Sequence, residues 1–293
     1  MSMTYKALAY GKINLHLDVL NRMENGYHNI ESIMQSVSLA DVITLEISDI
    51  DTDENVIKIV SSDNSVPTDK TNLVYKCVDR FLKHTNTCGK GCIFTIEKNI
   101  PIAAGMAGGS SDGATALKLI NEACGNLLNL NELCKLGAAV GADIPFCLTG
   151  GTCICKGIGE DITRLKSLKN VYLVSAIDYS SVSTPFAFSL LDEKYGTDNI
   201  NAKGLGDIIE AIESESIENV ALNLYNKFEE VIIPINPNVQ KIKDIMLQCG
   251  ALGTLMSGSG PSVFGIFIDE NSQKNALEKL KNCSINAFLC KTV

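Results

Sequence analysis

The sequence predicts an α+β protein built in two parts, and two observations carry this prediction. In the first half, residues 92–97 alternate as a β-strand does, residues 101–113 are rich in glycine, and apolar residues then recur at helical spacing from Ala114 to Cys124. In the second half the predicted order is strand, helix, strand, strand, helix, strand, which is typical of a sheet with helices on one face. The 293 residues allow one large or two medium domains.

The composition excludes several classes of function. A net charge of −9 leaves no broad basic face for nucleic acid, and no apolar run approaches the roughly 20 residues that span a bilayer. The N-terminus lacks the apolar core of a signal peptide, so we expect a cytoplasmic protein. The eleven cysteines are scattered and never spaced C-x-x-C, so we expect reduced, mostly buried thiols rather than zinc ligands.

The first predicted strand covers residues 7–20, and its two faces differ in polarity. One face carries four polar residues, namely Lys12, Asn14, His16 and Asp18. This alternation fits a half-buried strand with a wet face, and it also fits a polar face that lines a cleft.

A turn at Asn25-Gly26 follows this strand and presents Tyr27 beside His28. Such a pair is more often structural than part of a binding site. We then expect a strand over residues 37–47 and a hairpin partner over residues 56–60. A helix is expected over residues 72–83, with Thr71 or Asn72 at its start.

The glycine-rich segment 101–113 is the centre of the first half. Gly105, Gly108 and Gly109 allow backbone N–H groups to approach a bulky anion, and Ser110 and Ser111 are expected at the N-cap of the following helix. The segment lacks the Walker spacing, the Rossmann spacing and the protein-kinase triplets. A phosphate-binding turn and a tight strand-to-helix connection remain equally open at this point.

The next helix is expected over residues 131–140, ended by Gly141 as a C′ glycine. Asp143 then follows small residues and precedes Pro145. A carboxylate in such a setting is either a helix cap or a general base.

The second half contains a second glycine-rich turn at residues 257–262, which on its own fits a hairpin turn. Residues 180–185 are expected to form a polar loop. Regular elements are expected as strands over residues 171–177, 263–268 and 285–292 and as helices over residues 238–247 and 272–280, with helical segments between residues 203 and 223.

Three of these segments together resemble the motifs of the GHMP kinase superfamily. They are Ala-x-Gly-Lys-Ile-Asn-Leu ending at Leu15, Pro-x-x-x-Gly-Met-Ala-Gly-Gly-Ser-Ser at residues 101–111, and Gly-Ser-Gly-Pro-Ser at residues 258–262. The sequences around Tyr27-His28 and Asp143 further resemble members that act on a cytidine diphosphate-linked methylerythritol. The match runs in order along nearly the whole chain.

The resemblance implies a two-domain GHMP kinase fold with the active site in the cleft between the domains. Residues 1–161 would form an ATP-binding domain like ribosomal protein S5 domain 2, and residues 162–293 a ferredoxin-like α/β sandwich. The implied reaction is ATP-dependent phosphorylation of the C2 hydroxyl of the cytidylated substrate, in the non-mevalonate route to isoprenoids. Mg²⁺ is implied with ATP, although no carboxylate cage for it is evident and Ser110 or Ser111 is its expected protein ligand. The partners would be small molecules, in a monomer or weak homodimer.

The resemblance also assigns roles to single residues. Asp143 would take the hydroxyl proton, and Lys12 would hold Asp143 ionised and lie near the transferred phosphoryl group. Tyr27 and His28 would bind cytosine, Asn14 would bind the substrate beside Lys12, and Thr184 would line the methylerythritol end. The expected ATP-binding residues are Pro101, Ile102, Ala103, Ala104, Gly105, Met106, Ala107, Gly108, Gly109, Ser110 and Ser111, with Asn72 and Lys98 near the adenine.

Two alternatives stay open beside this interpretation. A GHMP kinase could act on another small alcohol, which would leave Tyr27 and His28 without a cytosine to bind. A nucleotide-binding regulator without catalysis is disfavoured because both Lys12 and Asp143 are retained. Lys98 fits a surface charge as well as an adenine contact.

Overall fold

The chain forms two compact units in a computed structural model that describes residues 2–102, 104–178, 182–197 and 202–293. Unit 1 contains the chain up to Gly11 together with Ala40–Ile102 and Ala107–Thr149. Unit 2 contains Lys12–Leu39, the short segment that ends at Met106, and Gly150–Val293. The domain boundary that we predict between residues 161 and 162 stays a prediction.

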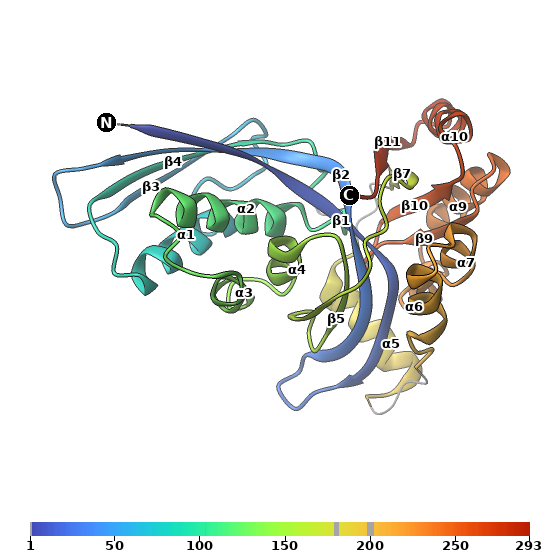
Figure 1. Cartoon of the computed structure of the whole chain (residues 1–293). Helices are drawn as coiled ribbons and strands as arrows, with labels where there is room; N and C mark the ends of the chain where they lie inside the picture. The colour runs from blue at the N-terminus through green and yellow to red at the C-terminus, as the bar shows by residue number, and fades with distance from the viewer. Residues whose placement is uncertain (1, 103, 179–181, 198–201) are drawn as a thin grey trace. The chain divides into compact units, whose positions relative to one another are not determined.

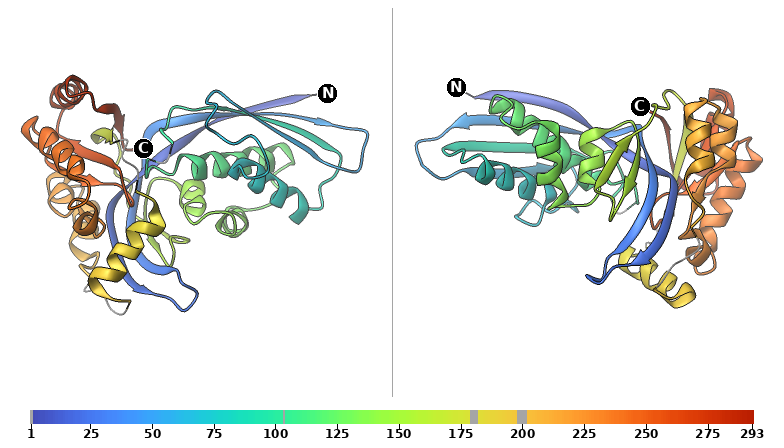
Figure 2. Two further views of the ribbon diagram at one scale, coloured as in Figure 1. Left: turned by 180° about the vertical axis from the view of Figure 1, so that it is seen from behind. Right: turned by 60° about the horizontal axis from the view of Figure 1, so that its bottom comes forward.

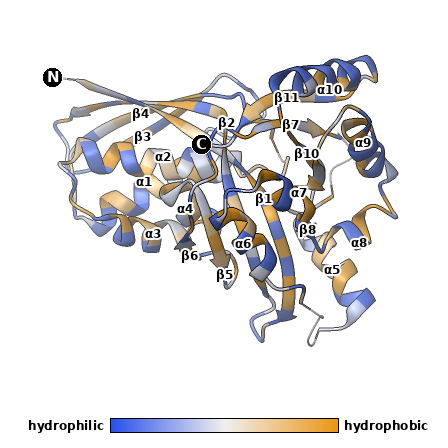
Figure 3. Ribbon diagram, turned by 45° about the vertical axis from the view of Figure 1, so that its right-hand side comes forward, coloured by the Kyte–Doolittle hydropathy of each residue, from blue (hydrophilic) through white to orange (hydrophobic). Residues whose placement is uncertain are grey.

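Two long strands contribute residues to both units. They are β1 (Met3–Arg22) and β2 (His28–Asp49), each longer than the sequence predicts. Between them the chain turns at Gly26, whose φ of +86° confirms the predicted turn. β1 carries hydrophilic and hydrophobic residues in alternation (Figure 3).

Unit 1 is a sheet with helices on one face. In Figure 1 all four helices of this unit lie on the same side of its strands. Their apolar side chains share one core with the sheet, in which Phe81 and Phe94 are fully buried. The elements beside β1 and β2 are β3 (Val56–Ser61), β4 (Lys90–Glu97), α1 (Leu73–His84), α2 (Gly108–Ala123), α3 (Leu130–Ala138) and α4 (Ile144–Thr149).

The predicted pairing of β3 is wrong. β3 is not the hairpin partner of β2, because β4 lies between them and pairs with β3 in parallel and with β2 antiparallel. A parallel neighbour requires a crossover connection, and α1 supplies it between β3 and β4. The sequence marks both strands, but it does not indicate this order.

Helix ends in unit 1 differ from the sequence prediction at two places. α2 starts after Ala107, which has a left-handed φ of 55° and makes no side-chain cap. Ser110 and Ser111 therefore lie inside the first turn, and their prediction as N-cap residues is wrong. α3 has Ala139 as its C-cap, so Gly141 lies beyond the predicted C′ position and that prediction is wrong as well.

Unit 2 contains a four-stranded antiparallel sheet in the order β11-β7-β10-β9. α9 packs on β9 and β10, and α10 packs on β7 and β11, so both helices cover one face of the sheet (Figure 2). This confirms the predicted ferredoxin-like order. The elements are β7 (Tyr172–Ile177), α9 (Pro237–Gln248), β9 (Gly253–Met256), β10 (Ser262–Phe267), α10 (Glu270–Asn282) and β11 (Asn286–Lys291).

The rest of unit 2 packs around the second half of β1 and the first half of β2, which belong to this unit. β1 pairs in parallel with β8, and β2 pairs with β5, which pairs with β6. These additional elements are β5 (Thr152–Lys156), β6 (Asp161–Arg164), α5 (Thr184–Tyr195), α6 (Gly206–Glu213), α7 (Ile217–Leu222), β8 (Tyr225–Asn226) and α8 (Glu229–Ile232).

Helix α5 is the largest element that the sequence prediction missed. We predict a polar loop over residues 180–185; residues 180 and 181 lie outside the described part of the chain, and from Thr184 the prediction is wrong. Ser183 is the N-cap, its side chain accepting from Phe186 N, and a proline occupies the first turn. A serine cap followed by proline is a helix-start signal that could have identified α5.

All eleven cysteines are free, but only five are buried and four are partly buried, so the prediction that most of them are buried is wrong. Cys88 and Cys283 are exposed. No helix within the described ranges has both the length and the apolar character needed to cross a membrane.

Candidate active site

The polar face of β1 is buried rather than wet. Lys12 is 5% exposed and Asn14 1% exposed. Lys12 Nζ donates to Asn14 Oδ1 over 2.8 Å, and Asn14 Nδ2 donates to Ser32 Oγ over 2.8 Å. Because Ser32 donates onward to the His16 carbonyl over 2.7 Å, the orientation of the Asn14 amide is fixed. The interpretation as a water-exposed face is therefore wrong.

Asn14 also connects β1 to the second glycine-rich turn. Its Oδ1 accepts from the backbone N–H of Gly258 over 3.0 Å. Gly258 has a left-handed φ of +60°, and a Cβ there would lie 3.7 Å from Lys12 Nζ. The turn joins β9 and β10, so it is a hairpin turn, and one of its donors is used by Asn14.

Gly105 and Met106 of the first glycine-rich segment lie beside this hairpin turn and β1. Gly105 has φ +71°, and a Cβ there would lie 2.5 Å from the Ser257 carbonyl oxygen. Ser257 Oγ donates to the Gly105 carbonyl over 3.2 Å, and the Lys12 N–H donates to the Met106 carbonyl over 3.0 Å. Within unit 2 the structure thus brings together residues from all three predicted motifs.

Thr184 belongs to this group as well. Its Oγ1 lies 2.9 Å from Ser259 Oγ, in the same hairpin turn. Thr184 is an exposed residue in the first turn of α5. The helix connects it to a second group of predicted residues.

That second group surrounds His28. His28 is 7% exposed, its Nε2 lies 2.8 Å from Asp192 Oδ1, and its ring stacks on Phe188. Tyr27 is 60% exposed beside it. Phe188 and Asp192 both come from α5, and the sequence analysis missed them because it did not recognise this helix.

In unit 1 the first turn of α2 follows the glycine-rich segment directly. Its first N–H groups have no partner within a helix and mark the positive end of the helix dipole. Gly109 is exposed and Ser110 partly exposed there, whereas Ser111 is buried and donates to the Tyr10 carbonyl over 2.7 Å.

The other residues of the predicted ATP-binding segment differ in how far they are exposed to solvent. Ile102 is 48% exposed, while Ala104 and Met106 are 2% and 1% exposed and pack as core residues. Pro101 and Gly105 are partly exposed. Ala103 lies outside the described residues.

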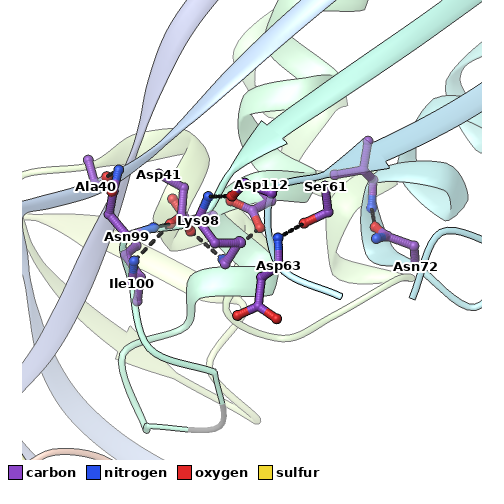
Figure 4. A network of polar contacts seen from close by, with 12 residues as sticks. Ala40, Asp41, Ser61, Asp63, Asn72, Lys98, Asn99, Ile100 and Asp112 are labelled. Carbon is purple, nitrogen blue, oxygen red and sulfur yellow. Dashed lines mark hydrogen bonds and ion pairs between the residues drawn. The ribbon is translucent and has the colours of Figure 1, made fainter. Parts of the chain in front are cut away.

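Lys98 is not a surface charge. Its side chain is 6% exposed, and its ammonium pairs with Asp41 and, over 2.9 Å, with Asp112 (Figure 4). The other oxygen of Asp41 accepts from the N–H groups of Asn99 and Ile100 over 2.6 and 2.8 Å. These contacts fasten both ends of the glycine-rich segment, since residues 98–100 precede it and α2 follows it.

In this cluster the carboxylates of Asp41 and Asp112 share the ammonium of Lys98. The pKa values of Asp112 and Lys98 are both raised. Burial raises the pKa of Asp112 to about 7, despite the attraction of Lys98. Burial alone would lower the pKa of Lys98, but the attraction of Asp112 and Asp41 outweighs it and raises that pKa. Asp112 Oδ1 has no hydrogen-bond partner among the described residues.

Asn72 caps α1. Its side chain accepts from Val74 N over 2.8 Å and donates to the Pro67 carbonyl over 2.5 Å. The predicted helix start is confirmed, with Asn72 rather than Thr71 as the cap. Both ends of the Asn72 amide are therefore engaged in the protein itself.

Asp143 is partly buried and immediately precedes α4. Its carbonyl accepts from the Cys147 N–H over 3.0 Å, which begins the helix. Asp143 belongs to unit 1 and Lys12 to unit 2. Within the described ranges, no cluster of three His, Cys, Asp or Glu residues could hold a metal ion.

Comparison with known proteins identifies relatives of this chain. Residues 72–151 match the GHMP kinases N terminal domain, and residues 208–286 match GHMP kinases C terminal. The 4-diphosphocytidyl-2-C-methyl-D-erythritol kinase of Caldicellulosiruptor saccharolyticus is 42% identical, over 93% of this chain and 91% of its own length. The enzyme of that name from Clostridium novyi is 40% identical, over 97% and 99%.

A solved structure agrees with these sequence relatives. The crystal structure of a 4-(cytidine 5'-diphospho)-2C-methyl-D-erythritol kinase has a TM-score of 0.79 to this chain at 27% identity. The match covers 98% of this chain and 99% of that one. Fold and sequence comparisons therefore lead to the same group of proteins.

Proposed function

Since this chain belongs to the GHMP kinase family, and within it to the 4-diphosphocytidyl-2-C-methyl-D-erythritol kinases, we propose that Lys12 and Asp143 carry out its phosphoryl transfer. The enzyme phosphorylates the C2 hydroxyl of 4-diphosphocytidyl-2-C-methyl-D-erythritol with ATP. The product is the 2-phosphate, in the non-mevalonate pathway to isopentenyl diphosphate. The observation that carries the proposal is the fixed Lys12–Asn14 pair at the meeting point of the three motifs.

Lys12 offsets negative charge on the transferred phosphoryl group. Its ammonium is buried and oriented by Asn14, so little reorganisation is needed when charge develops on the phosphoryl oxygens. A preorganised positive charge of this kind is a large part of catalysis in phosphoryl transfer. Asn14 has an additional role as a substrate contact beside Lys12.

Asp143 acts as the general base. Asp143 is partly buried, follows the small residues Gly141 and Ala142, and immediately precedes the short helix α4. It takes the proton of the C2 hydroxyl as that oxygen bonds to the γ-phosphorus, while the bond from the γ-phosphorus to the β,γ-bridging oxygen breaks and ADP leaves.

The ATP phosphates bind at the glycine-rich segment and the first turn of α2. The free N–H groups there, with Gly109 exposed, supply backbone donors and the positive end of the helix dipole in place of a Walker lysine. The Lys98 cluster fixes the ends of this segment. We place the adenine towards Asn72 and Lys98, although the polar groups of both are engaged within the protein.

Mg²⁺ is part of this proposal because the β- and γ-phosphates need neutralisation. Mg²⁺ prefers oxygen ligands and retains water, so one hydroxyl together with the phosphates fits its chemistry. Ser110 is the better candidate ligand, since it is partly exposed whereas Ser111 is buried. The ion would offset charge on the phosphates.

The cytidylated substrate binds along unit 2. Cytosine stacks on the exposed Tyr27 and bonds to His28, and Thr184 contacts the methylerythritol end. Aromatic stacking is worth about 1–3 kcal/mol per base. ATP and this substrate are the only partners in this proposal. The protein would act in the cytoplasm as a monomer or a weak homodimer.

A coupled assay of ADP release tests the proposed function. Purified protein, ATP and Mg²⁺ are combined with the cytidylated substrate, with the same polyol lacking its cytidine, and with homoserine or mevalonate. Turnover with the cytidylated compound alone supports the function and the roles of Tyr27 and His28. Turnover with homoserine or mevalonate alone would assign the chain to another alcohol.

A further inference from the structure

A single helix holds the imidazole of His28 from two sides. Phe188 of α5 stacks on the ring, with 4.4 Å between centroids and 13° between planes. Asp192, one turn further along α5, places Oδ1 2.8 Å from His28 Nε2. Residues four apart share one face of a helix, so both contacts come from the same face. The plane and the hydrogen-bonding edge of the ring are therefore both fixed.

The two holding residues are themselves supported. Phe188 packs edge-to-face on Phe228, with 5.0 Å between centroids, and Phe228 belongs to the buried core of unit 2. The second carboxylate oxygen of Asp192 lies 3.3 Å from the guanidinium of Arg22. Asp192 is 18% exposed at its side chain. This support gives the His28 ring the rigidity that a recognition group needs.

The contact with Asp192 determines which ring nitrogen carries the hydrogen. A carboxylate accepts hydrogen bonds and has no hydrogen to donate, so His28 Nε2 must be the donor. In the neutral ring the lone pair then lies on Nδ1, which can only accept. The hydrogen bond from Nε2 to Asp192 thus makes Nδ1, on the other edge of the ring, a hydrogen-bond acceptor.

We propose that Asp192 is a positioning residue that makes His28 Nδ1 a hydrogen-bond acceptor, and that this selects cytosine over uracil in the substrate. The inference rests on the proposed position of the base at Tyr27 and His28. Cytosine carries an amino group at C4, which donates, whereas uracil carries a carbonyl oxygen there, which accepts. An acceptor on His28 pairs with the first group and is mismatched with the second.

The tautomer can be measured without any substrate. The chain has only three histidines, so ¹⁵N-histidine NMR spectra are simple, and the loss of one signal set in His28→Gln assigns that residue. We expect the Nε2–H tautomer for His28 in the wild type and a mixture of tautomers in Asp192→Leu. An Nδ1–H tautomer in the wild type, or an unchanged tautomer in Asp192→Leu, would overturn the role of Asp192.

Base preference is the functional test. We compare kcat/KM for the cytidine and the uridine diphosphate-linked methylerythritol in the wild type, in Asp192→Leu and in Glu193→Gln, a control on the exposed neighbour. Asp192→Leu should lower the preference for cytidine about tenfold, the effect of losing one base-edge contact, mainly through KM. Glu193→Gln should keep the wild-type preference.

The two proposals fail in different ways. A wild type that does not turn over the cytidylated substrate removes the proposed function. Wild-type turnover with cytosine preference that persists in Asp192→Leu contradicts only the role of Asp192.

Discussion

The Lys98 ammonium lies 2.9 Å from the Asp112 carboxylate, with both groups buried. This contact joins the residue that precedes the glycine-rich segment to the helix that follows it. Asp41 completes the connection by pairing with Lys98 and by accepting from two backbone N–H groups. The segment that we propose for ATP is therefore fixed at both ends by charges that solvent does not reach.

Replacing Lys98 should destabilise the fold strongly. Lys98→Met leaves two carboxylates buried without a cation, which costs about 3–5 kcal/mol when one partner of a buried pair is removed. The free energy of unfolding, measured by urea titration, should fall by that amount. Lys6 serves as the control, because its pair with Glu97 is exposed and exposed pairs contribute little. Equal losses in Lys98→Met and Lys6→Met would contradict this account of the cluster.

His16 should make the fold sensitive to acid. Burial, and then repulsion by Lys203, lowers the pKa of His16 to about 4. Between pH 6.5 and 4 the unfolded chain takes up a proton that the folded chain refuses, so stability is present above this range and is lost as the pH falls. His16→Gln lacks this contribution.

The difference in unfolding free energy between wild type and His16→Gln should therefore shrink by about 2 kcal/mol between pH 7.5 and 4.5. Urea titrations at both pH values measure it. His84→Gln is the control, since His84 is exposed. A difference independent of pH would show that His16 is not held neutral by the fold.

Gly105 should tolerate no side chain. In Gly105→Ala the new Cβ would lie 2.5 Å from the Ser257 carbonyl oxygen, in addition to the left-handed φ of +71°. Gly125→Ala separates these two effects, because Gly125 has φ +85° and open space around its Cβ position. Backbone strain alone costs about 1–2 kcal/mol.

Gly105→Ala should lose clearly more unfolding free energy than Gly125→Ala, and its KM for ATP should rise. Thermal unfolding and steady-state kinetics give both quantities. Equal losses of unfolding free energy in Gly105→Ala and Gly125→Ala would contradict a contribution from the close approach of Gly105 to the hairpin turn.

The sequence allowed most of the fold to be predicted, because the signals are local. Alternation in β1 and the cap at Asn72 lead to the right elements, and the order of elements in the second half leads to the ferredoxin-like sheet. The pairing of β3 with β4 could not be predicted in this way, since strand order depends on contacts between segments far apart along the chain. The burial of Lys98 has the same origin, because its partner Asp41 is 57 residues away.

The candidate site was predicted in part for a similar reason. The resemblance to the family indicates Lys12, Asn14 and Thr184, which the structure brings together around one hairpin turn. Asp192 is absent from the predicted residues because the sequence analysis assigns no helix to residues 184–195, and without α5 nothing places Asp192 near His28. Ser183 and Pro185 carried the signal that could have corrected this.

The most direct test of the account is the kcat of Lys12→Met, Asp143→Asn and the double variant, at saturating ATP and cytidylated substrate. Each single change should lower kcat by about 10²-fold or more, as expected for loss of a general base or of charge stabilisation. The double variant should lose much less than the product of the two effects, because both groups act in one step. Near-normal turnover of Asp143→Asn would contradict its role as the base, and fully multiplicative losses would contradict the joint action of Lys12 and Asp143.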